Sequence, residues 1–385
     1  MSYGYADRVG CSELVKGDGN RCFCSMTAQQ FTDIPDYELL PYFAQVDHIG
    51  RYESGMVFIG DRSKFPFERS YVSCESVEEV AKAIESMVTQ GIGPHIVAAY
   101  AMVMAARRSD VEGGDKYKVL SEARDRLVAT RPTNTSTVRI LDRMLKIAGK
   151  EIANKCPTLE QPLLEWVQRD IFSVYERTHA QAVHAANVIA DGDGILTMCF
   201  AEAPFVWSLA IASHVQGKSL SVYVPETRPY LQGARLTAPS VHEVGVPVKL
   251  ITDNMPAYIM SQGKIQKYFT AADLVTLDGH VVNKIGTYQN AICAHHHSIP
   301  YFAFTRGPDP ARPTSESVVI EERDPSDIRR CRGVPTTVDE IDAYYPAFDI
   351  TSPHLVAGII TNLGVLSPYS IAKHYGRNST GSDSI

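Results

Sequence analysis

The sequence lacks a long apolar run, a block of basic residues and any low-complexity tract. A helix needs roughly 20 predominantly apolar residues to cross a bilayer, and no segment approaches that length, so we expect no association with a membrane. The 385 residues carry a formal net charge of −7 without a cluster of lysines or arginines, which argues against nucleic acid as a partner. No apolar leader is present, and the eight cysteines are irregularly spaced. We therefore expect a cytoplasmic protein with reduced thiols.

Two groups of metal-binding residue types do not match the pattern of a metal site. Cys22 and Cys24 form a single C-x-C, whereas a metal ion needs about four ligands, and no second pair lies nearby. His295, His296 and His297 are consecutive, so on a helix their imidazoles would point in different directions. We expect ordinary thiols and histidines here, and no metal.

The pattern of apolar residues divides the chain into four parts. Residues 1–55 are polar and irregular and are interpreted as an N-terminal extension, while the Ser/Gly-rich residues 377–385 form a flexible tail. Residues 56–185 are predicted to form a mainly helical N-terminal domain, because apolar residues recur there at helical spacing. Residues 186–376 follow a different pattern and form a C-terminal domain.

The helical part opens with strand and capping signals. Ser76 and Glu79 form a capping box at the start of one helix, and Thr158 with Gln161 forms another before a long helix. The predicted strands before these helices are Met56–Ile59 and Tyr71–Val72.

In the C-terminal domain, short apolar strands alternate with helices. Such alternation is typical of a doubly wound, mostly parallel sheet, so the fold class is α/β with a Rossmann-like second domain. Ligands bind such sheets beyond the carboxyl ends of the strands. The predicted strands are Ile195–Cys199, Leu220–Val224, Val248–Ile251, Tyr268–Val275 and Tyr301–Thr305, with edge strands at Val318–Ile320 and Asp349–Ile350.

Reactive side chains follow two of these strands. Cys199 ends the first strand, and Asp273 interrupts the apolar run of the fourth. A carboxylate inside an apolar run is costly unless it is paired or kept protonated. Each residue also has a structural interpretation: Cys199 as a buried thiol, and Asp273 as a strand-end acid bonded to backbone N–H groups. The glycine pattern of a dinucleotide site is absent after the first strand, so we expect no nicotinamide cofactor.

Polar and glycine-containing turns supply candidate anion contacts. Asn283 and Lys284 precede Gly286 just before a helical pattern, where free N–H groups and the helix dipole favour an anion. Gly91 lies in a turn between two helices, which is either a tight connector or a backbone approach to a ligand. Arg131 is either a solvated helix-end cation or a phosphate clamp. Together with Asp273, these residues indicate chemistry on a phosphorylated small molecule.

Several segments resemble the family of aldose 1-phosphate isomerases that includes 5-methylthioribose 1-phosphate isomerase. The family also contains ribose 1,5-bisphosphate isomerase, 5-deoxyribose 1-phosphate isomerases and the regulatory subunits of the translation-initiation guanine-nucleotide exchange factor. The similarity covers about Val57 to Pro368 in order. The segments that carry it are Gly192–Cys199, Glu226–Thr237, Ile251–Met255, Asn283–Tyr288 and Pro346–Asp349.

The resemblance implies a two-domain, metal-free aldose–ketose isomerase without a cofactor, usually a homodimer. It identifies Cys199 as the catalytic cysteine and Asp273 as the catalytic aspartate, a pair that the regulatory subunits generally lack. The implied substrate is first 5-methylthioribose 1-phosphate of methionine salvage. The alternatives are 5-deoxyribose 1-phosphate, ribose 1-phosphate and ribose 1,5-bisphosphate, or a regulatory subunit that binds a sugar phosphate without converting it. The implied substrate-binding residues are Gln90, Gly91, Arg131, Gln232, Asn283 and Lys284.

Three departures from the family pattern fall near the substrate pocket. Gln90 replaces an arginine, Phe200-Ala201-Glu202 replaces Asn-Ala-Gly after the cysteine, and Tyr345 replaces the asparagine before Pro346. Loss of the arginine argues against a bisphosphate, which needs a second cationic cradle. The reaction type is therefore more firmly indicated than the sugar.

The reaction assigns a role to each candidate. Because the phosphate on C1 locks the sugar ring, an acid must protonate the ring oxygen as it leaves, and burial would suit Asp273 to this task by raising its pKa. Cys199 would act at C1 and C2, either as a base or as a neighbour in a hydride transfer. The phosphate would be held by Arg131, Lys284 and N–H groups near Gly91 and Gly286, and the sugar hydroxyls by Gln232 and Asn283.

Overall fold

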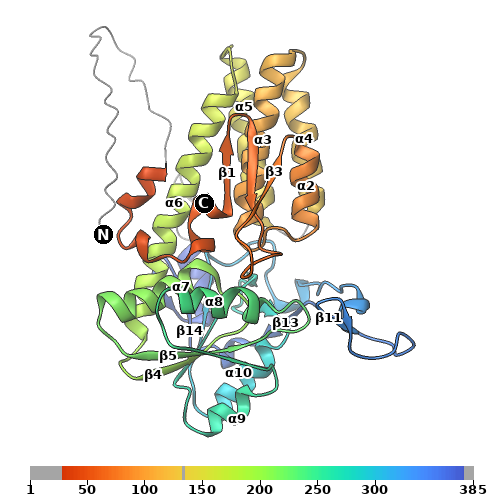
Figure 1. The fold of residues 1–385 in the computed structure, drawn as a ribbon. Coiled ribbons are helices and arrows are strands. Elements are labelled where there is room, and N and C mark those ends of the chain that lie inside the picture. Colours follow the sequence, from red (N-terminus) through yellow and green to blue (C-terminus); the bar gives the residue numbers. More distant parts are fainter. Residues whose placement is uncertain (1–27, 132–134, 377–385) are drawn as a thin grey trace, which may run out of the picture.

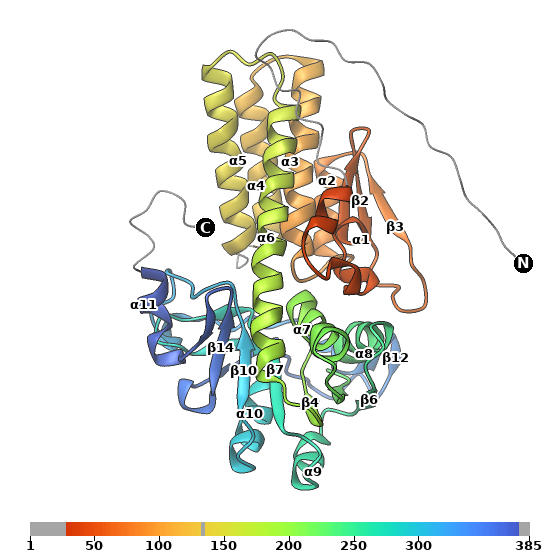
Figure 2. The same ribbon diagram turned by 90° about the vertical axis from the view of Figure 1, so that its left-hand side faces the viewer.

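The structure is a computed structural model that describes residues 28–131 and 135–376. A helical unit stands on an α/β unit, and the long helix α6 runs through both (Figure 1, Figure 2). No helix in these two ranges is long and apolar enough to cross a bilayer. The helices of the first unit are α1 (Val46–Ile49), α2 (Val77–Glu85), α3 (Gly93–Glu112), α4 (Lys116–Thr130), α5 (Thr135–Ala153) and α6 (Glu160–Val188).

A small antiparallel sheet accompanies these helices. Its strands β1 (Gly50–Glu53), β2 (Met56–Gly60) and β3 (Tyr71–Cys74) are paired in that order. The two strands predicted here are therefore confirmed, and β1 is an addition. The helix α3 lies at the centre of the unit and is buried along nearly its whole length, as expected for a helix that is apolar on every side.

The described part of the segment before β2 contributes to the core. Phe31, Ile34, Leu40 and Phe43 are each buried, within or directly after short 3₁₀ turns that precede β1. Short turns have neither the helical nor the strand period, so their apolar residues give no periodic signal in the sequence. The first 27 residues, including Cys22 and Cys24, lie outside the described ranges.

The α/β unit has a seven-stranded sheet in the order β15-β14-β10-β7-β4-β5-β6. All neighbours are parallel except β14 and β15. The chain works outwards from β4 in one direction, then returns and continues from β7 in the other, which is the Rossmann arrangement. The predicted fold class is confirmed. The strands are β4 (Asp193–Leu196), β5 (Leu220–Pro225), β6 (Val248–Ile251), β7 (Lys267–Ala271), β10 (Tyr301–Phe304), β14 (Gly358–Thr361) and β15 (Gly364–Leu366).

Helices cover both faces of this sheet (Figure 1). Because successive side chains of a strand point to opposite faces, Ile195 packs into the core shared with α6 and α7, whereas Leu196 packs into the core beneath α9 and α10. The helices are α7 (Glu202–Ala210), α8 (Ala238–Glu243), α9 (Pro256–Ser261), α10 (Thr287–His296) and α11 (Ile371–Gly376).

Two strand predictions in this unit are wrong. The strand predicted over Tyr268–Val275 is two strands, since β7 ends at Ala271 and β8 (Leu274–Val275) belongs to a separate antiparallel sheet. That sheet also contains β9 (Val281–Lys284) and β13 (Phe348–Thr351), in the order β13-β9-β8. No strand forms at residues 318–320.

Candidate active site

The sheet topology brings Cys199 and Asp273 to the same edge. Cys199 follows β4 and Asp273 follows β7, and these strands are paired through Leu196 and Tyr268. This is the point where the strand order reverses, the position at which open α/β sheets bind ligands. The two side chains also interact electrostatically, since the charge of Asp273 raises the pKa of the Cys199 thiol.

The Cys199 backbone is held in an unusual conformation. Its φ of +62° lies in the left-handed region, which residues other than glycine rarely adopt. Two threonines fix it: Thr227 Oγ1 accepts the Cys199 N–H at 3.1 Å, and the Thr237 hydroxyl donates to the Cys199 carbonyl oxygen. Burial raises the pKa of the thiol to about 11, with Lys284 opposing the shift. The thiol is therefore protonated at neutral pH.

Asp273 lies in the bend between β7 and β8, and its side chain is exposed. The expectation of an acid enclosed within an apolar strand is therefore wrong. The surrounding protein still raises its pKa, while Lys284, Arg323 and Arg131 lower it. Desolvation by the surrounding protein is the largest of these influences, so the raised pKa expected of this acid is retained although its side chain is exposed. In the described ranges, the carboxylate has no hydrogen bond or ion pair.

The three cations that act on Asp273 come from three parts of the chain, and we call them the cationic group. Lys284 ends β9 with only 4% of its surface exposed, and its Nζ lies 4.5 Å from the centre of the Phe348 ring. Arg323 pairs with Glu321 at 2.7 Å. Arg131 ends α4 and donates to the Ile84 carbonyl oxygen at 3.4 Å. Burial lowers the pKa of Lys284 and of Arg131.

Gln232 and Asn283, both predicted to bind sugar hydroxyls, are buried and differ in their partners. Asn283 donates from Nδ2 to Thr287 Oγ1 at 3.0 Å, and the Thr287 hydroxyl donates to the Lys284 carbonyl oxygen at 2.7 Å. Asn283 therefore fixes the turn that carries Lys284. The Oε1 atom of Gln232 is buried without a hydrogen-bond partner among the described residues, so it can accept a bond from a ligand hydroxyl.

The backbone N–H groups predicted to hold a phosphate are already occupied by carboxylates. Asp349 accepts the Gly286 N–H at 2.7 Å. Glu202 accepts the Ile92 N–H at 3.0 Å, directly after Gly91. The expectation that N–H groups near Gly91 and Gly286 are free for a phosphate is therefore not met. The Gln90 carbonyl oxygen is also occupied, by Nη1 of Arg62 at 2.6 Å.

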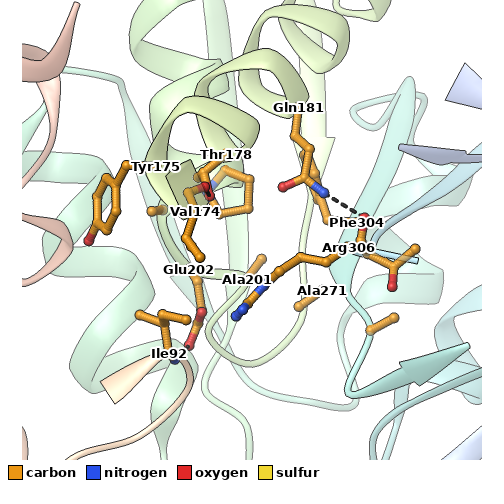
Figure 3. Close-up of a pocket in the computed structure, with 14 residues that line it drawn as sticks. Ile92, Val174, Tyr175, Thr178, Gln181, Ala201, Glu202, Ala271, Phe304 and Arg306 are labelled. Atoms are coloured by element: carbon orange, nitrogen blue, oxygen red, sulfur yellow. Dashed lines mark hydrogen bonds between the residues drawn. The ribbon is translucent and has the colours of Figure 1, made fainter. Parts of the chain in front are cut away.

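A cavity of about 110 Å³ lies against the two loops that carry the reactive pair (Figure 3). Its wall includes Ala201 and Glu202 from the loop that carries Cys199, and Ala272, which precedes Asp273. Arg306, which directly follows Thr305, also lines the cavity, and its side chain extends towards Glu202. The search along strand ends could have found Arg306, because it follows β10 almost directly.

Two further residues near the pair were not predicted as site residues. Arg323 comes from an irregular segment without a helical or strand period, so no sequence signal identified it. Tyr345 was noted only as a departure from the family, yet burial raises the pKa of its hydroxyl, Arg323 lowers it by charge and hydrogen bonding, and Cys199 lies within electrostatic reach. Among the described residues, no group of three or more His, Cys, Asp or Glu is arranged to hold a metal.

The Rossmann-like sheet, the helical unit on top of it and the thiol and carboxyl side chains at the switch point are the features of an α/β protein that binds a ligand at the carboxyl ends of its strands. The chain belongs to the Initiation factor 2 subunit family, whose sequence pattern matches residues 93–368. This confirms the resemblance inferred from the sequence.

Three relatives illustrate the range of this family. The methylthioribose-1-phosphate isomerase of Pelotomaculum thermopropionicum is 36% identical over 325 residues, covering 82% of this chain and 89% of that protein. The crystal structure of 5-methylthioribose 1-phosphate isomerase from Pyrococcus horikoshii OT3 matches with a TM-score of 0.73 at 29% identity, covering 86% of this chain and 94% of that one. Subunit delta of the translation initiation factor eIF-2B from A. fulgidus matches with a TM-score of 0.72 at 31% identity, covering 84% and 96%.

Proposed function

We propose that the protein is an aldose–ketose isomerase that converts a 5-modified ribose 1-phosphate, 5-methylthioribose 1-phosphate first, to the ribulose 1-phosphate. The observation that carries the proposal is the position of Cys199 and Asp273 at the switch point, beside the cationic group. The relatives named as methylthioribose-1-phosphate isomerases support the substrate class.

Ring opening is the step for which Asp273 is suited. The bond between C1 and the ring oxygen breaks, and the leaving oxygen takes a proton from a carboxyl group that must still hold one. The pKa of Asp273 is raised by the surrounding protein, which increases the protonated fraction at a given pH. The electron pair of the broken bond stays on the ring oxygen, so positive charge develops at C1, next to the phosphate.

Hydrogen must then move from C2 to C1, and Cys199 is the residue assigned to this step. In one route, a base removes the C2 proton and C1 is protonated afterwards. In the other, hydride passes directly from C2 to C1 while the C2 hydroxyl gives its proton to the Asp273 carboxylate that ring opening has left deprotonated. A thiol whose pKa is about 11 is a poor base at neutral pH. The hydride route is therefore favoured, with Cys199 as a neutral, polarisable neighbour.

The phosphate is assigned to the cationic group rather than to backbone N–H groups. Arg131, Lys284 and Arg323 all act electrostatically on Asp273, so an anion bound among them lies near the reacting carbons. In the described residues, Lys284 has no carboxylate partner within ion-pair distance, and a phosphate would supply one.

The experiment is a panel of ribose 1-phosphates that differ at C5, with ketose formation as the measured quantity. We expect turnover of 5-methylthioribose 1-phosphate, with the 5-deoxy and 5-hydroxy sugars as the alternatives. A second candidate, a binding-only subunit, is favoured by the equally good match to an initiation factor subunit. It predicts thermal stabilisation by the sugar phosphates without ketose formation from any of them.

Three further statements belong to the same proposal. They are a homodimer, which the family resemblance implies, a cytoplasmic location, which the irregularly spaced cysteines indicate, and a role in methionine salvage, which the names of the relatives support. The division at residues 55/56 and 185/186 into an extension, a helical domain and a Rossmann-like domain is proposed from the pattern of apolar residues, with the pairing of β1 and β2 joining the end of the extension to the helical domain. Light scattering of the purified protein tests the dimer, with a monomer mass contradicting it.

A further inference from the structure

Glu202 connects the loop that carries Cys199 to the helical unit. It begins α7 with a φ of +62°, a left-handed conformation that is strained for a residue with a Cβ atom. Strain of this kind persists only where the surroundings enforce it, and it concentrates at functional positions. The Glu202 carboxylate reaches across to α3, where it accepts the Ile92 N–H.

The position that this carboxylate occupies is one that would otherwise attract an anion. Ile92 immediately precedes the first residue of α3, a helix of 20 residues, and free N–H groups and the helix dipole favour negative charge there. Gly91 makes the contact possible, since a Cβ atom on Gly91 would lie 1.0 Å from Glu202 Oε1. The chain therefore fills its own anion position.

Two arginines flank the Glu202 carboxylate. Arg62 is 2% exposed and donates to the carbonyl oxygens of Gln90 and Phe43 at 2.6 and 2.9 Å, which leaves its Nε without a partner in the described ranges. Arg306 is exposed and extends towards Glu202 in the cavity (Figure 3). Both lower the pKa of Glu202, which burial raises. Neither arginine is within ion-pair distance of Glu202 among the described residues. Glu202 and Arg306 both line the cavity, so space remains between these two charges.

That space suits an uncharged group, because a methylthio substituent can contact the apolar side chains of Ile92, Val174 and Phe304, which line the same cavity as Glu202 and Arg306. A hydroxyl can donate to the Glu202 carboxylate and accept from the Arg306 guanidinium, which satisfies both. A phosphate placed there would put like charges side by side in a partly dehydrated site, where repulsion is strong. The cavity is lined by Ala272, the neighbour of Asp273, and by Glu202. A substrate whose C1 and C2 lie at Asp273 could therefore extend its C5 end into the cavity, towards Glu202.

We propose that Glu202 is a specificity-determining residue that prevents this end of the site from accepting a second phosphate. The enzyme would then act on ribose 1-phosphates with an uncharged C5 substituent and reject ribose 1,5-bisphosphate. The inference rests on the isomerase function proposed above. It assigns the 1-phosphate to the cationic group and the C5 end to the Glu202 side.

The test compares kcat/KM for 5-methylthioribose 1-phosphate and ribose 1,5-bisphosphate in the wild type, Glu202→Gln and Glu202→Gly. The Gln variant removes the charge with little change in shape, and the Gly variant suits the left-handed backbone. We expect each to raise the ratio of bisphosphate to monophosphate kcat/KM by about tenfold or more. Glu226→Gln is the matched control, because its charged neighbours are Asp253 and Arg228, and we expect it to leave the ratio unchanged.

The outcomes separate a selective role from a structural one. If Glu202 only joins the two units, both substrates lose kcat/KM together, the ratio stays constant and the inference is wrong. If both substrates gain equally, Glu202 acts against the 1-phosphate, which also contradicts it. If the wild type converts no ribose 1-phosphate, the isomerase function fails instead. Thermal stabilisation by ribose 1,5-bisphosphate, larger in the variants than in the wild type, then still tests the inference without turnover.

Discussion

Positively charged groups lie on both sides of the Cys199–Asp273 pair, but only on one side does a carboxylate of the chain fill the place of an anionic ligand. On one side, the cationic group surrounds Asp273, and Lys284 has no carboxylate partner within ion-pair distance in the described chain. On the other side, the N-terminus of α3 and two arginines converge on the Glu202 carboxylate, which the chain itself supplies. Positive charge on one side is available to a ligand, and on the other side it is already balanced.

This difference indicates which end of a substrate each side can bind. A phosphate is stabilised where cations lack an anion, and it is repelled where one is present. A site with two open cationic ends would fit a bisphosphate, whereas a site with one open end fits a monophosphate. Each prediction below changes one side of the pair, or the pair itself, and asks whether this asymmetry controls activity.

The largest effect is expected at Cys199 and Asp273, the reactive pair that lies between the two sides. Asp273→Asn removes the proton donor, and Cys199→Ala removes the group at C1 and C2, so we expect turnover to fall by about 10²–10⁴-fold in each. Ketose formation measures the loss, and circular dichroism with thermal melting checks that the fold persists. Near-normal kcat in either folded variant would remove that residue from the mechanism.

Next in size is the difference between the two sides. Lys284→Met removes a cation from the side assigned to the phosphate, where a charged hydrogen bond is lost, and we expect kcat/KM to fall by about 100-fold. Arg306→Met changes the side assigned to C5, and we expect a loss of about tenfold or less for the same monophosphate. Equal losses in the two variants would contradict the assignment of ends.

Much of this arrangement could be predicted from the sequence, because parallel strands leave a periodic signal. The strands β5 and β6 follow their predicted ranges closely, and the strand-end rule places Cys199 and Asp273 at one edge. The capping box at Ser76 also forms, although Glu79 Oε2 accepts the Glu75 N–H rather than that of Ser76.

What could not be predicted depends on contacts between distant segments. The start of α6 is capped by Asp110, which accepts the Leu159 and Glu160 N–H groups at 2.7 and 3.0 Å, and not by the predicted box at Thr158 and Gln161. Glu202 reaches Ile92 in the same long-range way. Neither contact has a local period or spacing that reveals it.

A smaller effect is expected in the pH dependence, where neighbours shift the pKa of Asp273 in opposite directions. If Asp273 acts as an acid, kcat/KM falls as the pH rises through its raised pKa. Glu321 raises this pKa and Lys284 lowers it. Glu321→Gln should therefore move the alkaline limb of the pH–rate profile to lower pH, and Lys284→Met should move it to higher pH. Shifts in the same direction in both variants would show that another group sets the limb.

The smallest effect concerns Asp349. Its carboxylate accepts the Gly286 N–H, one of the two backbone positions at which a phosphate was expected. Burial raises its pKa to about 6, above the value of about 3.9 in an unfolded chain. The folded state therefore holds the proton more tightly, so the stabilising contribution of this group is full below the unfolded pKa and is lost as the pH rises to about 6. Asp349→Asn removes the titration.

Between pH 5 and pH 7.5, we expect the melting temperature of the wild type to fall by roughly 2 °C relative to that of Asp349→Asn. This corresponds to a loss of about 1 kcal/mol in the free energy of unfolding. Ser76→Ala serves as the control, because it removes an N-cap worth about 1 kcal/mol that does not titrate, and its difference in melting temperature from the wild type should stay constant. Asp349 accepts N–H groups within its own unit, whereas Glu202 crosses to the other. Asp349→Asn should therefore leave the substrate ratio unchanged, and an altered ratio would mean that any carboxylate at these turns affects selectivity.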